Sequence, residues 1–207
     1  MSLDFAATRE RLPYQGISLG IMALLASAAL VFANHATREA IAAAAARDLQ
    51  TSLAQVLPAG FADNDMLADT LQVGGSAGKR VYRARRQGAV TGAVFQTAAR
   101  GYAGDVVVLI GVDRAGMLLG ARVIKHSETP GLGDKIDAAK SKWILGFDGK
   151  SLDNLPAGQW AVKKDGGAFD QFAGATITPR AVVKAVKGGL DFYAAHRAEI
   201  IAEGNKP

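Results

Sequence analysis

The stretch that decides the fold reads Lys79-Arg-Val-Tyr-Arg-Ala-Arg-Arg-Gln-Gly-Ala-Val-Thr-Gly-Ala-Val-Phe-Gln-Thr97, followed by Asp105-Val-Val-Val-Leu-Ile-Gly-Val112 and Met117-Leu-Leu-Gly-Ala-Arg-Val-Ile-Lys125. It contains four short alternating runs, each of which predicts a strand: 81–85, 89–97, 105–112 and 117–125. Glycine-containing breaks separate the runs: Gln87-Gly88, Ala99-Arg-Gly101 and Asp113-Arg-Ala-Gly116. Strands joined by such short turns predict an antiparallel meander.

Helical patterns return only after these strands, near 134–143 and at the C-terminus, where Val182, Val183, Val186, Leu190 and Tyr193 form one apolar stripe. Strands first and helices later predict an α+β domain rather than a doubly wound one. Residues 59–78 carry turn residues and small residues without a sustained period, so we expect a connector there.

Basic residues gather in the first predicted strand, at Lys79, Arg80, Arg83, Arg85 and Arg86. A nucleic-acid patch is one interpretation of this cluster. However, Arg83 and Arg85 alternate with Ala84, as expected on the solvated face of a strand. We therefore favour a solvated face and expect no nucleic-acid partner.

An uncharged segment precedes the domain, because no Asp, Glu, Lys or Arg lies between Arg11 and Arg38. Its centre, residues 16–33, is almost entirely apolar, and a bilayer core needs roughly 20 such residues as a helix. A cleaved signal peptide is the alternative, but its apolar region usually has about 7 to 15 residues. We favour an uncleaved transmembrane anchor. Arg9, Arg11 and the free amino terminus before the span, against Arg38 and Arg47 behind it, favour a cytoplasmic N-terminus and an external domain.

Behind the anchor, Ile41, Ala45, Leu49, Leu53 and Val56 recur at helical spacing. We expect the membrane helix to continue through them as a stalk. The predicted organisation is an N-terminal tail and transmembrane anchor over 1–34, a helical stalk and connector over 35–78, and one domain over 79–207.

Composition limits the chemistry of the 207 residues, which have no cysteine, three histidines and a net charge of +5. Without a thiolate there is no disulfide, no cysteine zinc site and no protein-held iron–sulfur cluster. His35, His126 and His196 lie too far apart for a local metal-ligand motif, so we predict no metal site. Any redox or group-transfer chemistry must come from an added group. The charge surplus permits anionic partners without indicating one.

Two segments stand out from this scaffold. The first is His126-Ser-Glu-Thr-Pro-Gly-Leu-Gly-Asp134, at the end of the last predicted strand. Pro130-Gly131 predicts a tight turn, and Gly133 frees a second backbone position, so backbone amides there could approach a flat ligand. An ordinary strand-to-helix loop explains the same residues.

The second segment is Asp170-Gln-Phe-Ala-Gly-Ala-Thr-Ile-Thr-Pro-Arg180, which leads into the C-terminal helix. Thr178 followed by Pro179 predicts a helix start, with the Thr178 hydroxyl as cap. Thr176 would then lie just before a helix N-terminus, where free amides and the macrodipole stabilise an anion such as phosphate. A capped helix with a small-residue turn is the simpler interpretation.

Together the two segments resemble the FMN-binding domain shared by the G subunit of the Rnf electron-transport complex and the C subunit of the sodium-pumping NADH:quinone oxidoreductase. Both of these proteins have one N-terminal transmembrane helix, a Glu-Thr-Pro-Gly-Leu-Gly loop and an Asp-x-x-Ser/Thr-Gly-Ala-Thr motif before a helix. The matches here are Glu128 to Gly133 and Asp170…Gly174-Ala175-Thr176, and the resemblance covers residues 10–200. The short chain is closer to the Rnf protein. Ala173 departs from the motif, which usually has Ser or Thr there.

The resemblance implies that a flavin transferase joins FMN through its phosphate to the hydroxyl of Thr176. The transferase would recognise Asp170, Gly174, Ala175 and Thr176. The loop would lie against the isoalloxazine ring, and His126 could stabilise a reduced flavin or have only a structural role. The cofactor-binding residues implied are Glu128, Thr129, Gly131, Leu132, Gly133, Gly174, Ala175, Thr176, Ile177 and Thr178.

The function implied is that of an electron-transfer subunit of a bacterial inner-membrane, ion-translocating ferredoxin/NAD oxidoreductase complex. Its partners would be other membrane and redox subunits, the flavin transferase and the lipid bilayer, and it would have no catalytic residue or substrate of its own. A membrane-tethered assembly or binding module without cofactor is the alternative. A free-standing flavin reductase is disfavoured, because the chain has no Gly-x-Gly-x-x-Gly fingerprint.

Overall fold

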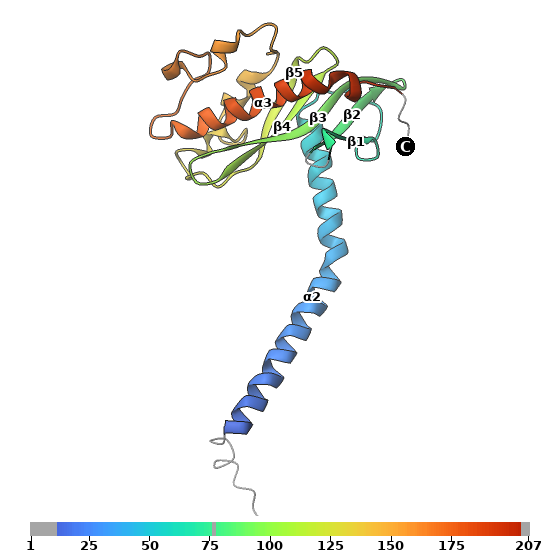
Figure 1. Cartoon of the computed structure of the whole chain (residues 1–207), viewed down its shortest axis with the longest axis vertical. Coiled ribbons are helices and arrows are strands. Elements are labelled where there is room, and N and C mark those ends of the chain that lie inside the picture. The colour runs from blue at the N-terminus through green and yellow to red at the C-terminus, as the bar shows by residue number, and fades with distance from the viewer. Residues whose placement is uncertain (1–11, 76–77, 204–207) are drawn as a thin grey trace, which may run out of the picture. The chain divides into compact units, whose positions relative to one another are not determined.

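A computed structural model describes residues 12–75 and 78–203 (Figure 1). The chain divides into two compact units, Met1–Asp48 and Leu49–Pro207. The described part of the first unit is helical and belongs to α2 (Leu12–Gln55). The second unit contains a five-stranded sheet and the C-terminal helix α3 (Ile177–Ile200).

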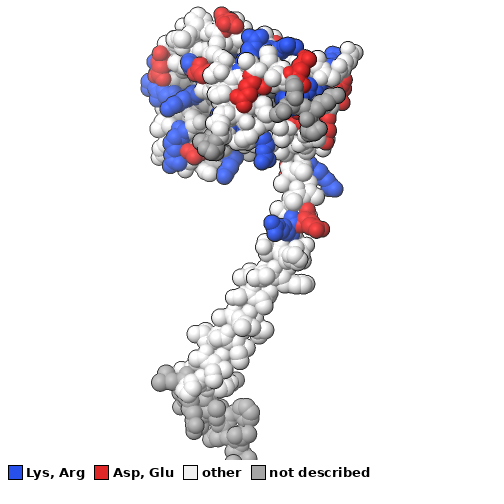
Figure 2. Space-filling view, turned by 45° about the vertical axis from the view of Figure 1, so that its right-hand side comes forward, with Lys and Arg blue, Asp and Glu red and all other residues white. Residues whose placement is uncertain are grey.

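Helix α2 runs without a break for 44 residues, which confirms that the apolar segment continues into a helical stalk. It is long and apolar enough to cross a bilayer, and no other helix in residues 12–75 and 78–203 is. All side chains from residue 13 to residue 48 are exposed. Figure 2 shows an uncharged surface along most of this helix, with charged side chains near its end. Arg9 and Arg11 lie outside the described residues.

The sheet is an antiparallel meander in the order β1-β2-β3-β4-β5, as the alternating runs predicted. Its strands are β1 (Thr70–Val73), β2 (Lys79–Arg86), β3 (Ala89–Arg100), β4 (Asp105–Asp113) and β5 (Leu118–Lys125). Strand β1 was not predicted. It lies within the expected connector and pairs with β2, from Thr70↔Tyr82 to Val73↔Lys79.

Both faces of the sheet are covered, so the alternation along the strands separates two apolar clusters rather than a wet and a dry face. Helix α3 lies across one face (Figure 1), where its whole predicted stripe is buried with core residues such as Phe95. On the other face Tyr82, Val94 and Leu109 pack against Leu53 and Val56, around the end of α2. The domain is thus an α+β layer structure.

The segment between β5 and α3 differs from the expectation of a helix over 134–143. It contains four short 3₁₀ helices, η2 (Asp134–Ile136), η3 (Lys142–Phe147), η4 (Ala157–Gln159) and η5 (Lys163–Asp165). Aromatic contacts hold it together: Phe147 and Phe169 stack with ring centroids 4.2 Å apart, and Trp143 meets Phe172 at 5.2 Å. These contacts fix the chain that leads into α3.

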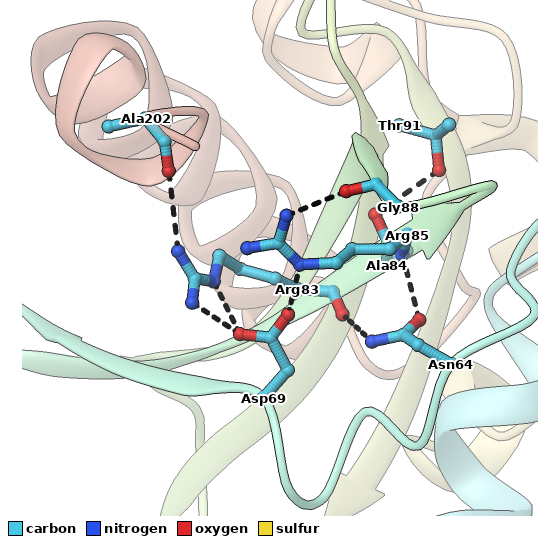
Figure 3. Close-up of polar contacts among 8 residues, drawn as sticks. All are labelled: Asn64, Asp69, Arg83, Ala84, Arg85, Gly88, Thr91 and Ala202. Carbon is cyan, nitrogen blue, oxygen red and sulfur yellow. Dashed lines mark hydrogen bonds and ion pairs between the residues drawn. The ribbon is translucent and has the colours of Figure 1, made fainter. Parts of the chain in front are cut away.

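The prediction that Arg83 and Arg85 lie on a solvated face is wrong. Arg83 is 2% exposed, and both guanidinium groups pair with the buried carboxylate of Asp69 (Figure 3). Arg83 Nε lies 2.7 Å from Asp69 Oδ1, and Arg85 Nε lies 2.5 Å from Asp69 Oδ2. The alternation is real, but the segment before β1 and the C-terminal end of α3 cover that face. Arg83 Nη1 also donates to the carbonyl of Ala202 (3.4 Å), so the cluster joins three distant parts of the chain.

Candidate functional site

The two segments singled out in the sequence meet in space around one pocket of about 290 Å³. One wall is the loop after β5, and the other is the turn that enters α3. A Cβ added at Gly174 would lie 3.3 Å from Leu132 Cδ2, so the two walls approach each other closely there. The lining residues are Tyr102, Glu128, Thr129, Leu132, Gly133, Gly174, Ala175, Thr176, Ile177 and Thr178.

Glu128 is the buried centre of this arrangement, with 4% of its surface exposed. Its Oε1 accepts a hydrogen bond from the backbone N–H of Ala103 (3.1 Å), in the turn between β3 and β4. Its Oε2 accepts from the hydroxyl of Thr178, in the first turn of α3. A single carboxylate therefore joins a hairpin turn, the loop and the helix, because each of its oxygens has a different partner.

The loop after Glu128 is a tight turn, as predicted from Pro130-Gly131. Leu132 N–H donates to the carbonyl of Thr129 (3.2 Å), and Gly131 has a φ of +78°, which favours glycine. Gly133 is buried, and a Cβ there would lie 2.9 Å from Glu128 Cβ and 3.0 Å from Thr178 Oγ1. Glycine at 133 thus lets the loop approach α3 closely enough for the Glu128–Thr178 contact.

Helix α3 begins two residues earlier than expected, at Ile177, and its cap is not Thr178. The residue at the N-cap is Thr176, whose side chain makes no capping hydrogen bond. Thr178 is 1% exposed and uses its hydroxyl for Glu128 instead. The buried carboxylate is a stronger acceptor than solvent, and it draws Thr178 into the first turn. Pro179 fits the same turn, since an N–H there would have no helical partner.

Thr176 is half-buried at the pocket and has no hydrogen bond from its hydroxyl to any residue in the described ranges. The preceding Gly174 has a φ of +80°, which turns the chain sharply into the helix. Together these features place an unengaged hydroxyl at the N-terminus of a 24-residue helix.

Four residues from the sequence interpretation do not line this pocket. Gly131 is exposed at the tip of the turn. Asp170 is exposed and pairs with Lys163 Nζ at 2.6 Å. Ala173 is exposed beside Gly174. His126 accepts the backbone N–H of Glu128 through Nδ1 (3.2 Å), which is a structural contact.

Tyr102 lines the pocket but escaped the sequence analysis. It lies in the turn between β3 and β4, 69% exposed, and reaches the site only because that hairpin folds beside the loop after β5. The available signal in the sequence was a large aromatic residue directly after the predicted break Ala99-Arg-Gly101.

Residues 101–191 match the family model of the FMN-binding domain. The chain is 53% identical over 190 residues to the G subunit of the ion-translocating oxidoreductase complex of Cereibacter sphaeroides, covering 90% of this chain and 86% of that protein.

The chain belongs to the family of G subunits of ion-translocating oxidoreductase complexes. The G subunit of Stutzerimonas stutzeri is 50% identical over 188 residues (90% of this chain, 82% of that one). That of Pseudomonas aeruginosa is 43% identical over 204 residues, 95% of either chain. Among solved structures, NqrC of Shewanella oneidensis aligns with a TM-score of 0.47 and 20% identity over 67% of each chain. The resemblance to the G-subunit family that the two motifs indicated is thereby confirmed. The region matched to the FMN-binding domain contains every residue that lines the pocket.

Proposed function

We propose that the chain is a membrane-anchored electron-transfer subunit whose FMN is joined covalently, through its phosphate, to Thr176. The observation that carries the proposal is the unengaged Thr176 hydroxyl, at a helix N-terminus and in the pocket within the region matched to the FMN-binding domain. The relatives' names supply the setting, a subunit of an ion-translocating oxidoreductase complex.

The chemistry at Thr176 is the replacement of its O–H bond by an Oγ–phosphorus bond. A flavin transferase would supply FMN activated as a phosphoanhydride. The anhydride phosphorus–oxygen bond would break as the Oγ–phosphorus bond forms, the second phosphate would depart with the bonding electron pair, and the hydroxyl proton would leave to solvent. Thr176 suits this role because it is half-buried at the pocket and its hydroxyl makes no capping hydrogen bond, whereas Thr178 is buried and its hydroxyl donates to Glu128. Asp170 is exposed six positions earlier, where the transferase could reach it.

The start of α3 suits a phosphodiester. Such a group keeps one negative charge, and the first amides of a long helix together with its macrodipole stabilise an anion there. The carboxylate of Glu128 is also close, but it is already satisfied by Ala103 and Thr178. The free amides at the helix start therefore remain for the phosphate.

The walls of the pocket suit a flat aromatic ring. Tyr102, Leu132 and Ile177 line it and are 69%, 43% and 45% exposed, so they offer apolar surface that no described residue covers. The pocket volume of about 290 Å³ lies just below the range for small-molecule sites, about 300 to 1,000 Å³. A flavin held there would remain partly accessible, as a relay between proteins requires. The bound flavin would supply one-electron transfer, while these side chains orient it and exclude water from one side.

In this proposal residues 1–34 anchor the chain in the bacterial inner membrane, with the N-terminus cytoplasmic and the flavin domain external. The long uncharged stretch of α2 before Arg38 supports an anchor. Membrane and redox subunits of the complex would be the electron partners. The absence of charged residues between Arg11 and Arg38 leaves ion movement to those partners.

The attachment is tested by coexpressing the full chain with the flavin transferase and recording flavin fluorescence on a denaturing gel, with the intact mass measured in parallel. The wild-type band should fluoresce, and Thr176→Ala should be dark. Thr129→Ala removes another threonine hydroxyl from the same pocket and should stay fluorescent. A dark wild-type band would favour the cofactor-free assembly module, and a fluorescent Thr176→Ala band would exclude Thr176 as the attachment residue.

Electron relay has a separate test, because attachment alone does not establish it. A complex that contains Thr176→Val should assemble normally and lose electron transfer through this chain. Full electron transfer in such a complex would contradict the relay.

A further inference from the structure

Strand β3 extends beyond its partner β2. Its register with β4 continues to Arg100↔Asp105, whereas its register with β2 stops at Val81↔Phe95. Within residues 12–75 and 78–203, the end of β3 therefore has a strand neighbour on one edge only.

The free edge presents backbone hydrogen-bonding groups. The carbonyl of Thr91 accepts from Arg114 N–H on the β4 side, and carbonyls alternate along a strand. Those of Gln96, Ala98 and Arg100 consequently point to the opposite edge. Lys79 Nζ, on the β2 side, approaches the Gln96 carbonyl at 3.5 Å, which agrees with this assignment. An open edge of this kind is a template for an added strand.

A groove of about 690 Å³ runs along this edge, between β3, helix α3 and the segment around Trp160. Its lining has four basic and two acidic side chains. Arg180 pairs with Asp165 (Nε to Oδ2, 2.6 Å), Lys187 with Asp191 (2.9 Å) and Arg100 with Asp105 outside the lining (3.5 Å), while exposed Lys184 has no ion pair in the described parts of the chain. The groove therefore has a positive surplus that complements an acidic partner.

Gly188, in the middle of α3, is a further feature that suits binding of a peptide chain in the groove. Glycine weakens a helix interior relative to alanine, so it needs a reason there. Its neighbour Gly189 has one, because a Cβ there would lie 2.5 Å from Ile110 Cδ1. A Cβ on Gly188 would meet nothing within 4 Å, and Gly188 lines the groove. The absence of a side chain at Gly188 leaves room in the groove for the backbone of a bound peptide.

We propose that this groove binds an extended acidic segment of another protein chain, which adds to β3 as a strand beyond Phe95. The backbone of Ala98 and Arg100 would form the ladder, the surplus positive charge would select acidic side chains, and Gly188 would allow the close approach.

The test is a titration of the full chain in detergent micelles, followed through indole N–H resonances. The chain has two tryptophans, of which Trp160 lines the groove and Trp143 does not. The probe is a blocked octapeptide of alternating glutamate and valine. We expect a saturable shift of the Trp160 resonance and none of the Trp143 resonance.

Two control peptides separate the two sources of binding. Replacing each valine by proline keeps the charge and prevents a strand ladder, and replacing each glutamate by lysine keeps the ladder and reverses the charge. Neither should bind. Equal binding of the proline peptide would refute strand addition, and equal binding of the lysine peptide would refute selection of acidic segments.

Variants of the chain locate the site. Gly188→Ala and Lys184→Glu should each weaken peptide binding about tenfold, by filling the groove or reversing its charge. Arg86→Glu, with the same charge change at an exposed position outside the groove, should bind like wild type. Gly188→Ala should melt no lower than wild type, so its weaker binding would not reflect unfolding. Equal affinity of Gly188→Ala and wild type would overturn the proposal.

A Trp160 resonance that moved with protein concentration alone would instead identify a second copy of this chain as the occupant. The titration uses the chain without flavin, so its failure leaves the assignment of Thr176 untouched.

Discussion

The two ends of helix α3 satisfy their polar groups in different ways. At the C-terminal end the Ala202 carbonyl accepts from Arg83, which is buried in the ion-pair cluster with Asp69 and Arg85. At the N-terminal end Thr176 has an unengaged hydroxyl at an open pocket. The difference shows where the helix is held and where it is open: one end is fixed by buried ion pairs, and the other has an unengaged hydroxyl at the pocket.

The largest effect is expected at the fixed end, from Asp69→Ala. Two guanidinium groups would stay buried without their carboxylate, which should lower the free energy of unfolding by about 3 to 5 kcal/mol. This free energy of unfolding is measured by urea titration of the full chain, with tryptophan fluorescence as the signal. Asp105→Ala, which breaks an exposed pair with Arg100, is the control and should change it by less than about 1 kcal/mol. Equal losses in the two variants would show that the buried Asp69 cluster does not stabilise the domain more than an exposed ion pair does.

Thr178→Val probes the contact behind the open end. The substitution leaves the buried Glu128 carboxylate without one partner, so we expect a loss of about 1 to 3 kcal/mol in the same assay. Thr178→Ser keeps the hydroxyl and should recover most of that loss. If valine and serine behaved alike, the Glu128–Thr178 hydrogen bond would not be what holds the loop on the helix.

Tyr193, in the C-terminal half of α3, gives a pH test of burial. Burial raises the pKa of Tyr193 to about 12, while the unfolded side chain titrates near 10. Between pH 10 and 12 the folded chain therefore keeps a proton on Tyr193 that the unfolded chain loses. The contribution of Tyr193 to the free energy of unfolding is fully present below pH 10 and is lost as the pH rises toward 12. By pH 11 the unfolding free energy should fall by about 1 kcal/mol more in wild type than in Tyr193→Phe. Parallel pH profiles for the two proteins would contradict the shift.

The smallest effect on stability is expected from Thr176→Val in the chain without flavin. The Thr176 hydroxyl caps nothing and has no partner among the described residues, so the change should stay within about 0.5 kcal/mol. In the chain coexpressed with the flavin transferase, the same substitution should abolish flavin attachment. A loss comparable to that of Thr178→Val would assign the Thr176 hydroxyl a structural role.

The sequence predicted those parts of the molecule that depend on local periodicity. The strands from β2 to β5, the apolar stripe of α3 and the turn at Pro130-Gly131 were all visible because each repeats or breaks within a few residues. The two motif segments were also found, although only the structure shows that they form one pocket.

The residues whose roles were not predicted from the sequence depend on contacts with distant segments of the chain. Arg83 has the alternation of a solvated position and is buried because Asp69, from an unrecognised neighbouring segment, pairs with it. Thr178 has the sequence of a cap and serves Glu128 instead, 50 residues earlier. Tyr102 reaches the site only through the β3–β4 turn. Such tertiary contacts have no local sequence period.

The hydrogen bonds of the Glu128 carboxylate also bear on the stage of folding at which the pocket forms. This carboxylate joins the turn at Ala103 to the start of α3 at Thr178, so it requires segments that are 25 and 50 residues away to be in place together. Closing loops of this length costs conformational entropy that other contacts must first offset. We therefore expect the pocket around Thr176 to form late in folding, so that a complete pocket indicates a complete domain.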